Sequence, residues 1–149
     1  MKKLLPLLAL SSLLMACGPT STTSTPTDST GIKGIWKGEY ACGDALLTLD
    51  LKDVNGEQVK GVFNFAYYAN STTKALDPAR QGSFNLSGTF KNNILDLKAG
   101  SWINKPGGTW YTLDVMTTYD PAKNQFVGTL PKSQGGPVSD ACLKVTLTR

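Results

Sequence analysis

The clearest fold signal in this 149-residue chain is Leu47-Thr48-Leu49-Asp50-Leu51-Lys52-Asp53-Val54-Asn55-Gly56-Glu57-Gln58-Val59. Leucine alternates with polar residues through 47–52, which is the period-two pattern of a strand with one buried face. Asn55-Gly56 is a favoured dipeptide for a tight hairpin turn. A second alternating run follows at 59–67 and places on its inward side Val59, Gly61, Phe63, Phe65 and Tyr67. The stretch therefore predicts an antiparallel hairpin that covers a core.

Six further runs with the same period flank this hairpin. They lie at 36–42, 84–90, 95–97, 111–115, 126–130 and 143–148, and the run at 111–115 places Tyr111, Leu113 and Val115 on one side. No run has the spacing of an amphipathic helix. We predict an all-β domain, a single eight-stranded antiparallel up-and-down barrel, because closure removes the exposed edges of an open sheet. An open two-sheet sandwich is the alternative.

The first 31 residues differ in composition from this domain. Lys2 and Lys3 precede an apolar stretch at 4–14, which is too short to cross a bilayer because a helical span takes roughly 20 residues. Together with Ala16 and Cys17, this order resembles a bacterial lipoprotein signal. The resemblance implies a lipid such as palmitate on Cys17 and a place in the bacterial cell envelope, at the outer membrane. We predict a signal peptide at 1–16, a lipidated cysteine and disordered Ser/Thr/Pro linker at 17–31, and the barrel at 32–149.

Two cysteines remain once Cys17 carries a lipid. Cys42 and Cys142 would face the oxidising envelope, where disulfides persist, so we expect them to form a disulfide bond. In a barrel with an even number of strands, the first and last strands are antiparallel neighbours. Cys42 then ends the first strand beside Cys142 at the start of the last, and the bond closes the seam. At the other end of the seam, Trp36 should meet Arg149 in a cation–π contact.

The three longest predicted connections fall at one end of the barrel, at about 70–81, 100–108 and 131–141. The first strand starts at the opposite end, so these loops should face away from the membrane, and long loops are often functional. The candidate binding residues lie in or near them: Trp102, Ile103, Asn104, Lys105, Tyr67, Tyr68, Arg80 and Lys132. Trp102 and Lys105 offer the ring and the cation that anchor protein interfaces or stack on sugars. Alternatively, Trp102 fills the barrel mouth as part of the core.

The composition narrows the chemistry. The chain has no histidine, and with both domain cysteines bridged it has no free thiol, so the usual general base and the common zinc ligands are missing. We expect no catalytic residue, no metal and no cofactor. Without Lys2 and Lys3, 13 of the 15 basic residues remain against 11 acidic ones, scattered along the chain, which argues against a nucleic-acid partner. The many inward aromatic residues favour a filled barrel over a wide ligand cavity.

Three family resemblances add to these expectations. The Gly34-Ile35-Trp36 opening, the closing Arg149 and the segment Thr117-Thr118-Tyr119-Asp120 between two predicted strands are similar to lipocalin and wider calycin patterns. Tyr40-Ala41-Cys42 with Cys142 resembles the frame of small envelope lipoproteins that inhibit C-type lysozymes. The segments 38–42, 82–88, 102–107 and 142–149 resemble an uncharacterised bacterial β domain. The first resemblance implies a carrier of small ligands and the second implies an inhibitor of a hydrolase.

We therefore predict a non-enzymatic, membrane-anchored envelope lipoprotein, monomeric, whose long-loop end binds a protein partner in the envelope or outside the cell. Inhibition of a hydrolase is one form that such binding can take. The alternatives are a lipocalin-like carrier of a small apolar ligand and a structural component of the envelope.

Overall fold

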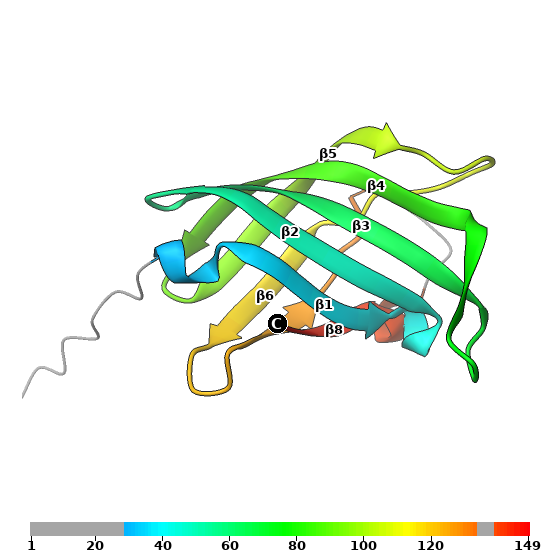
Figure 1. Ribbon diagram of the computed structural model, residues 1–149. Helices are drawn as coiled ribbons and strands as arrows, with labels where there is room; N and C mark the ends of the chain where they lie inside the picture. Colours follow the sequence, from blue (N-terminus) through cyan, green and yellow to red (C-terminus); the bar gives the residue numbers. More distant parts are fainter. Residues whose placement is uncertain (1–28, 134–138) are drawn as a thin grey trace, which may run out of the picture.

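The computed structural model of the protein describes residues 29–133 and 139–149. It shows a closed barrel of eight antiparallel strands that follow one another in chain order (Figure 1). The strands are β1 (Gly34–Tyr40), β2 (Ala45–Asn55), β3 (Gln58–Asn70), β4 (Ala75–Lys91), β5 (Ile94–Asn104), β6 (Val115–Asp120), β7 (Gln125–Thr129) and β8 (Lys144–Thr148). The predicted up-and-down barrel is confirmed, and the sandwich alternative is wrong.

Three short 3-10 turns accompany the strands: η1 (Ser29–Ile32), η2 (Ala41–Gly43) and η3 (Asp140–Leu143). The predicted signal peptide, Cys17 and most of the predicted linker lie outside the described residues. Within the described part of the chain, no helix has the length and apolar character that a membrane crossing requires.

The barrel has a long wall and a short wall. Strands β2 to β5 contain 11, 13, 17 and 11 residues, whereas β6, β7 and β8 contain only 6, 5 and 5. The long strands run past the short ones toward one end, which we call the mouth. Side chains near the ends of β3, β4 and β5 therefore have no strand opposite them, and the chain segments between strands cover that space instead.

The core lies inside the barrel and follows the predicted alternation. Leu47, Leu49 and Leu51 of β2 are fully buried, and so are Trp36 and Phe126 on facing strands. Trp36 meets Phe126 edge to face, with ring centroids 4.7 Å apart. Such aromatic pairs stabilise a core beyond the area they bury, and this one fills the end of the barrel opposite the mouth.

The seam between β1 and β8 is fastened at both ends, as predicted. Cys42 in η2 is bonded to Cys142 in η3 at the mouth end. At the other end, the guanidinium carbon of Arg149 lies 4.3 Å from the ring centroid of Trp36. Between them, a methyl group at Gly38 would collide with the backbone oxygen of Thr146, so the close approach of the two strands requires glycine there.

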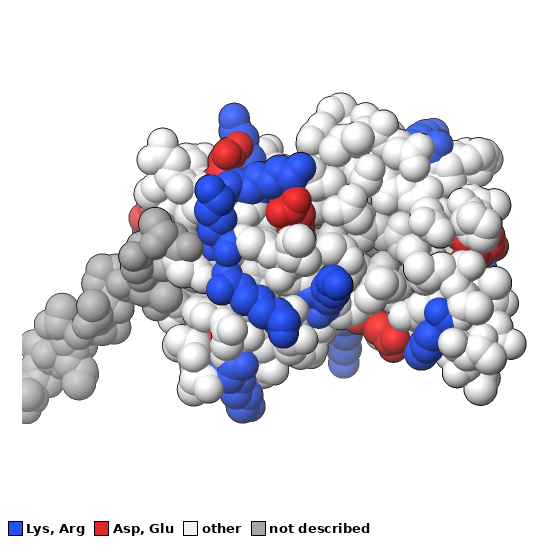
Figure 2. All heavy atoms as spheres, viewed as in Figure 1, with Lys and Arg blue, Asp and Glu red and all other residues white. Residues whose placement is uncertain are grey.

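The predicted separation of short and long connections holds only in part, because the β3–β4 connection at the mouth is the short turn 71–74. The β2–β3, β4–β5 and β6–β7 turns lie at the same end as η1, while the β1–β2, β3–β4 and β5–β6 connections lie at the mouth (Figure 1). The chain therefore enters the barrel at the pole opposite the mouth. In the view of Figure 2, basic side chains gather over β1 and β2 in the half nearer η1, and the half nearer the mouth is mostly uncharged.

Several predicted boundaries are wrong. The expected loop at 70–81 is mostly strand, because β3 and β4 continue to pair as far as Asn70 and Ala75. The expected loop at 100–108 begins only after Asn104, so Trp102, Ile103 and Asn104 belong to β5. Cys42 does not continue the face of the first strand but lies in η2, where its φ of 58° ends the extended conformation.

The sixth strand is displaced by four residues along the chain. It runs from Val115 to Asp120 instead of 111–115, so Thr117-Thr118-Tyr119-Asp120 forms the strand and not the connection after it. Tyr111 is 40% exposed, contrary to its predicted inward position, whereas Leu113 and Val115 are buried as expected. Leu113, Val115 and Thr117 are buried at alternate positions, so the alternating pattern starts before β6 does. The predicted start of the strand is therefore too early in the sequence.

Candidate functional site

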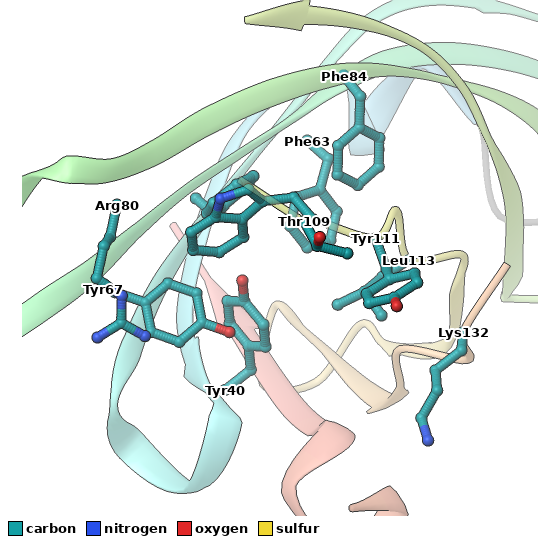
Figure 3. Close-up of a pocket in the computed structure, with 11 residues that line it drawn as sticks. Tyr40, Phe63, Tyr67, Arg80, Phe84, Thr109, Tyr111, Leu113 and Lys132 are labelled. Atoms are coloured by element: carbon teal, nitrogen blue, oxygen red, sulfur yellow. The ribbon is translucent and has the colours of Figure 1, made fainter. Parts of the chain in front are cut away.

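The barrel is filled along most of its length but is hollow at the mouth. A cavity of about 200 Å³, here called the mouth cavity, opens there. Its lining consists of Tyr40, Phe63, Phe65, Tyr67, Arg80, Phe84, Thr109, Trp110, Tyr111, Leu113 and Lys132. The cavity thus joins residues of β1, β3 and β4 to residues of the two connections that cross the mouth (Figure 3).

The floor of the mouth cavity is aromatic. Phe63 of β3 and Phe84 of β4 are paired in register and stack with ring centroids 4.6 Å apart. Tyr40, at the last position of β1, meets Phe63 edge to face at 6.0 Å. Successive side chains of a strand point to opposite faces of the sheet, and these three side chains point to the inside of the barrel. The alternation within each strand and the register between β3 and β4 therefore explain the aromatic floor.

Phe65, Tyr67 and Trp110 form one side of the cavity. The Trp110 ring lies 5.3 Å from Phe65 and 5.6 Å from Tyr67, measured between centroids. Gly82 of β4 makes room for this group, since a Cβ atom there would lie 2.7 Å from the Phe65 ring and 2.8 Å from Pro106. A larger residue at Gly82 would therefore displace either the Phe65 ring or the segment around Pro106 that leads to Trp110.

The segment 105–114 carries Trp110 from the edge of β5 toward β3. The indole Nε1 of Trp110 donates a hydrogen bond to the Gly107 carbonyl oxygen at 2.8 Å, which holds the ring against its own loop. At the end of the segment, Oδ1 of Asp114 accepts the backbone N–H of Ala99 at 2.9 Å. The Asp114 side chain thus accepts a backbone N–H of β5 at the point where β5 no longer pairs with β6. Beyond this point β5 and β6 separate, and the mouth stays open.

Two cations border the cavity. The guanidinium carbon of Arg80 lies 4.3 Å from the Tyr67 ring centroid, and Figure 3 shows its side chain beside that ring. Lys132 forms an ion pair with Asp140 at 3.6 Å, and its ammonium group points away from the rings in Figure 3. No Asp or Glu among the described residues lines the cavity, so both charged lining residues are positive.

The Tyr40 hydroxyl is a hydrogen-bonding group inside this apolar lining. The side chain is only 4% exposed, and in Figure 3 its oxygen points into the cavity. Burial raises the pKa of Tyr40 well above its usual range, and the neighbouring Tyr67 raises it further. The hydroxyl therefore stays protonated near neutral pH and can donate a hydrogen bond to a bound molecule.

The structure brings together only some of the candidate binding residues. Tyr67, Arg80 and Lys132 line the mouth cavity. Trp102 is half-buried and packs edge to face on Phe84 at 5.3 Å, just behind the cavity floor, as its alternative role in the core predicts. Lys105 lies outside the lining, with its ammonium 6.0 Å from the Trp102 ring centroid.

The other three candidates also lie outside the mouth cavity. Tyr68 is on the outer face, where its hydroxyl donates to Glu39 Oε1 at 3.0 Å. Ile103 is exposed at the end of β5, and Asn104 lines a separate shallow surface hollow. The proposed contact stretch 102–105 is therefore a rim beside the cavity and not its wall.

Trp110 is the site residue that sequence reasoning missed. It follows Gly107-Gly108 in a segment without alternation, so no strand pattern indicates which way its side chain points. The signal that could have found it is its residue type, because a tryptophan in a connection is usually buried against another part of the protein. Tyr40, Phe63, Phe65 and Phe84 are buried and face inward, as the alternating pattern of a strand predicts for aromatic residues on its inner face. Their position beside an unfilled volume depends on the unequal strand lengths.

Within residues 29–133 and 139–149, no group of three or more Cys, Asp or Glu residues is placed to hold a metal ion. Asp44 and Asp140, which flank the disulfide, have separate partners: Asp44 accepts the Ser71 hydroxyl at 2.9 Å and Asp140 pairs with Lys132.

No protein-family model, curated protein or solved structure was found to match this chain. The resemblances to calycins, to lysozyme inhibitors and to the bacterial β domain stay predictions from short motifs.

Proposed function

We propose that this protein is a lipid-anchored envelope protein that binds a small, ring-shaped and largely apolar ligand in the mouth cavity. The observation that carries the proposal is an aromatic cavity of about 200 Å³ in a barrel that is otherwise filled. An apolar cavity of about 150 Å³ is large enough for benzene, and typical sites for drug-sized ligands start at about 300 Å³. The size favours one or two rings over a long lipid chain.

The lining supports binding rather than catalysis. It contains seven aromatic side chains, one leucine, one threonine and two cations. Aromatic faces with a few polar groups are typical of ligand sites, in which the polar groups orient the ligand. The lining offers neither a carboxylate nor a thiol to act as base or nucleophile, and the chain has no histidine.

A titration of the full chain with 2-naphthylmethanol tests the proposal. The chain carries Cys17→Ser so that no lipid is attached, and binding is followed by calorimetry and by amide NMR shifts. We expect binding that shifts the amides of β3, β4 and segment 105–114. Trp110→Ala should weaken the affinity about tenfold, because it removes an aromatic wall. Tyr68→Ala, an aromatic control outside the cavity, should leave it unchanged. Absence of binding at millimolar ligand, or equal losses in both variants, contradicts the proposal.

The membrane anchor is a separate part of the proposal. It is supported by the signal-like order of Lys2, Lys3, the apolar stretch and Cys17, and by the entry of the chain at the pole opposite the mouth. In cells, Cys17→Ser should move the protein from the outer-membrane fraction to the soluble fraction. A protein that stays in the membrane fraction despite the substitution argues against the lipid.

A second candidate function is capture of a protein partner, such as a hydrolase, by the rim beside the cavity. It is favoured by Ile103, which is 56% exposed at the end of β5 next to Lys105. The pair Ile103→Asp and Lys105→Glu should abolish crosslinking to the partner in the native envelope while the barrel stays folded. Ile35→Asp is a matched control, since Ile35 is 54% exposed on the first strand. Unchanged crosslinking in the double variant rejects the rim.

A further inference from the structure

We propose that the ligand of the mouth cavity is an aromatic anion of one or two rings, whose negative group is bound by Arg80. This inference rests on the proposed ligand-binding function and adds the chemical class of the ligand. It starts from the charges at the cavity and not from the shape of the barrel.

Arg80 is placed to recognise an anion. Its guanidinium lies against the Tyr67 ring at 4.3 Å, a contact that holds the plane of the group and leaves its edge for hydrogen bonding. Among the described residues, the Arg80 side chain takes part in no ion pair and no side-chain hydrogen bond. An arginine held in this way can donate two parallel hydrogen bonds to one carboxylate.

The charge balance of the cavity favours the same ligand class. Both charged lining residues are cations, and Lys132 is already paired with Asp140. Arg80 is therefore the lining cation whose charge no described carboxylate offsets. A ligand that enters with a negative group meets attraction at the mouth, whereas a cationic ligand meets repulsion.

The aromatic part of the ligand follows from the arrangement of the rings. Tyr67 connects the two parts of the site, because one contact joins it to Arg80 and another joins it to Trp110 at 5.6 Å. A planar ring beside Trp110 and Phe65 would place a substituent near the guanidinium. Deeper in the cavity, the protonated Tyr40 hydroxyl can donate to a second polar group of the ligand.

The test compares 2-naphthoate with the neutral 2-naphthylmethanol on the full Cys17→Ser chain, by calorimetry at low ionic strength. We expect 2-naphthoate to bind about tenfold more tightly, the effect of one charge-assisted pair of hydrogen bonds. Arg80→Gln should remove this preference, because it should weaken binding of 2-naphthoate about tenfold more than it weakens binding of the alcohol. Arg80→Lys keeps the charge without the planar fork and should retain part of the preference.

Lys105→Gln is the matched control for general electrostatics. Lys105 is a mouth cation outside the cavity lining, so its loss should not change the preference for the anion. If both compounds bind equally, or if Lys105→Gln reduces the preference as much as Arg80→Gln, the assignment of Arg80 is wrong and the ligand cavity survives. If neither compound binds, the inference and the proposed function both fail.

Discussion

Arg149 shows how one residue can fasten a barrel. Besides its contact with the Trp36 ring, its Nη2 atom donates to the carbonyl oxygens of Gly31 and Lys33, at 2.8 and 2.7 Å. The last residue of the chain thereby holds the segment that enters the first strand. These contacts lie at the seam where β1 pairs with β8, with Lys37 opposite Thr148.

Arg149→Ala should lower the free energy of unfolding by about 1–3 kcal/mol, because it removes a cation–π contact and two hydrogen bonds from a charged donor. Urea unfolding followed by tryptophan fluorescence measures the loss. Arg149→Lys keeps the charge but cannot reproduce both bonds and should recover less than half of it. Lys144→Ala, at an exposed position of β8, is the control and should change stability by less than about 0.5 kcal/mol. A similar effect in both alanine variants would contradict the role of Arg149.

At the scale of elements, the β3–β4 hairpin is tied to the end of β1. The Lys74 ammonium lies 2.9 Å from Glu39 Oε1, and the Tyr68 hydroxyl donates to the same oxygen. The hydrogen bond from Lys74, and then the one from Tyr68, hold the pKa of Glu39 below its ordinary value. A lowered folded-state pKa contributes stability above the unfolded-state pKa, and this contribution disappears as the pH falls through the folded-state pKa.

An NMR titration of the Glu39 carboxyl carbon should therefore give a midpoint below the ordinary glutamate value. Lys74→Met should raise this midpoint, because it removes the main cause of the shift. Lys91→Met is the control, since Lys91 pairs with Glu57 at the other pole, 3.0 Å away. An unchanged Glu39 midpoint in Lys74→Met would show that the hairpin is not held by this contact in solution.

The disulfide acts between η2 and η3, the elements that end β1 and begin β8. Its cysteines are 100 residues apart in sequence, and closing a loop of this length constrains the unfolded chain by up to about 4.7 kcal/mol. Cys42→Ala combined with Cys142→Ala should lower the unfolding free energy by about 2–5 kcal/mol in urea. The control is the unmodified chain with reductant added, which should lose a similar amount. An unchanged midpoint in both would mean that the strand pairs close the barrel by themselves.

At the scale of the whole molecule, stability should be uneven around the barrel. Strands β2 to β5 form long ladders with one another, whereas β6 to β8 are short. Local opening requires less energy where fewer pairs must break. Native-state hydrogen exchange should therefore find the slowest amides in β2 to β5 and faster ones in β6 to β8. Equal protection in both walls would contradict this division.

The uneven walls also place the candidate site. The mouth cavity lies where the long wall continues and the short wall has ended, so β3 and β4 form its floor and segment 105–114 crosses above it. Ligand should add the most protection to the amides of segment 105–114, which supplies Trp110, because those residues lie outside the long strands.

Local patterns were sufficient for most of the fold. The alternation of Leu47, Leu49 and Leu51 predicts their burial because period two in a strand needs no distant information. The antiparallel closure of an even number of strands predicted that Cys42 meets Cys142 and Trp36 meets Arg149. The same patterns failed at residues 75–81 of β4, which lack alternation. Ala75, Leu76 and Gln81 of this stretch pair with β3, and the register shifts between them.

Residue patterns are enough to predict the barrel, its closing contacts and the inward direction of Tyr67. Three-dimensional packing is needed to find that Arg80 stacks on Tyr67, that Trp110 completes the aromatic side and that Trp102 lies behind it. A cavity is the volume that packing leaves empty, so it depends on unequal strand lengths and on the path of segment 105–114 across the mouth, and no local run of residues encodes either one.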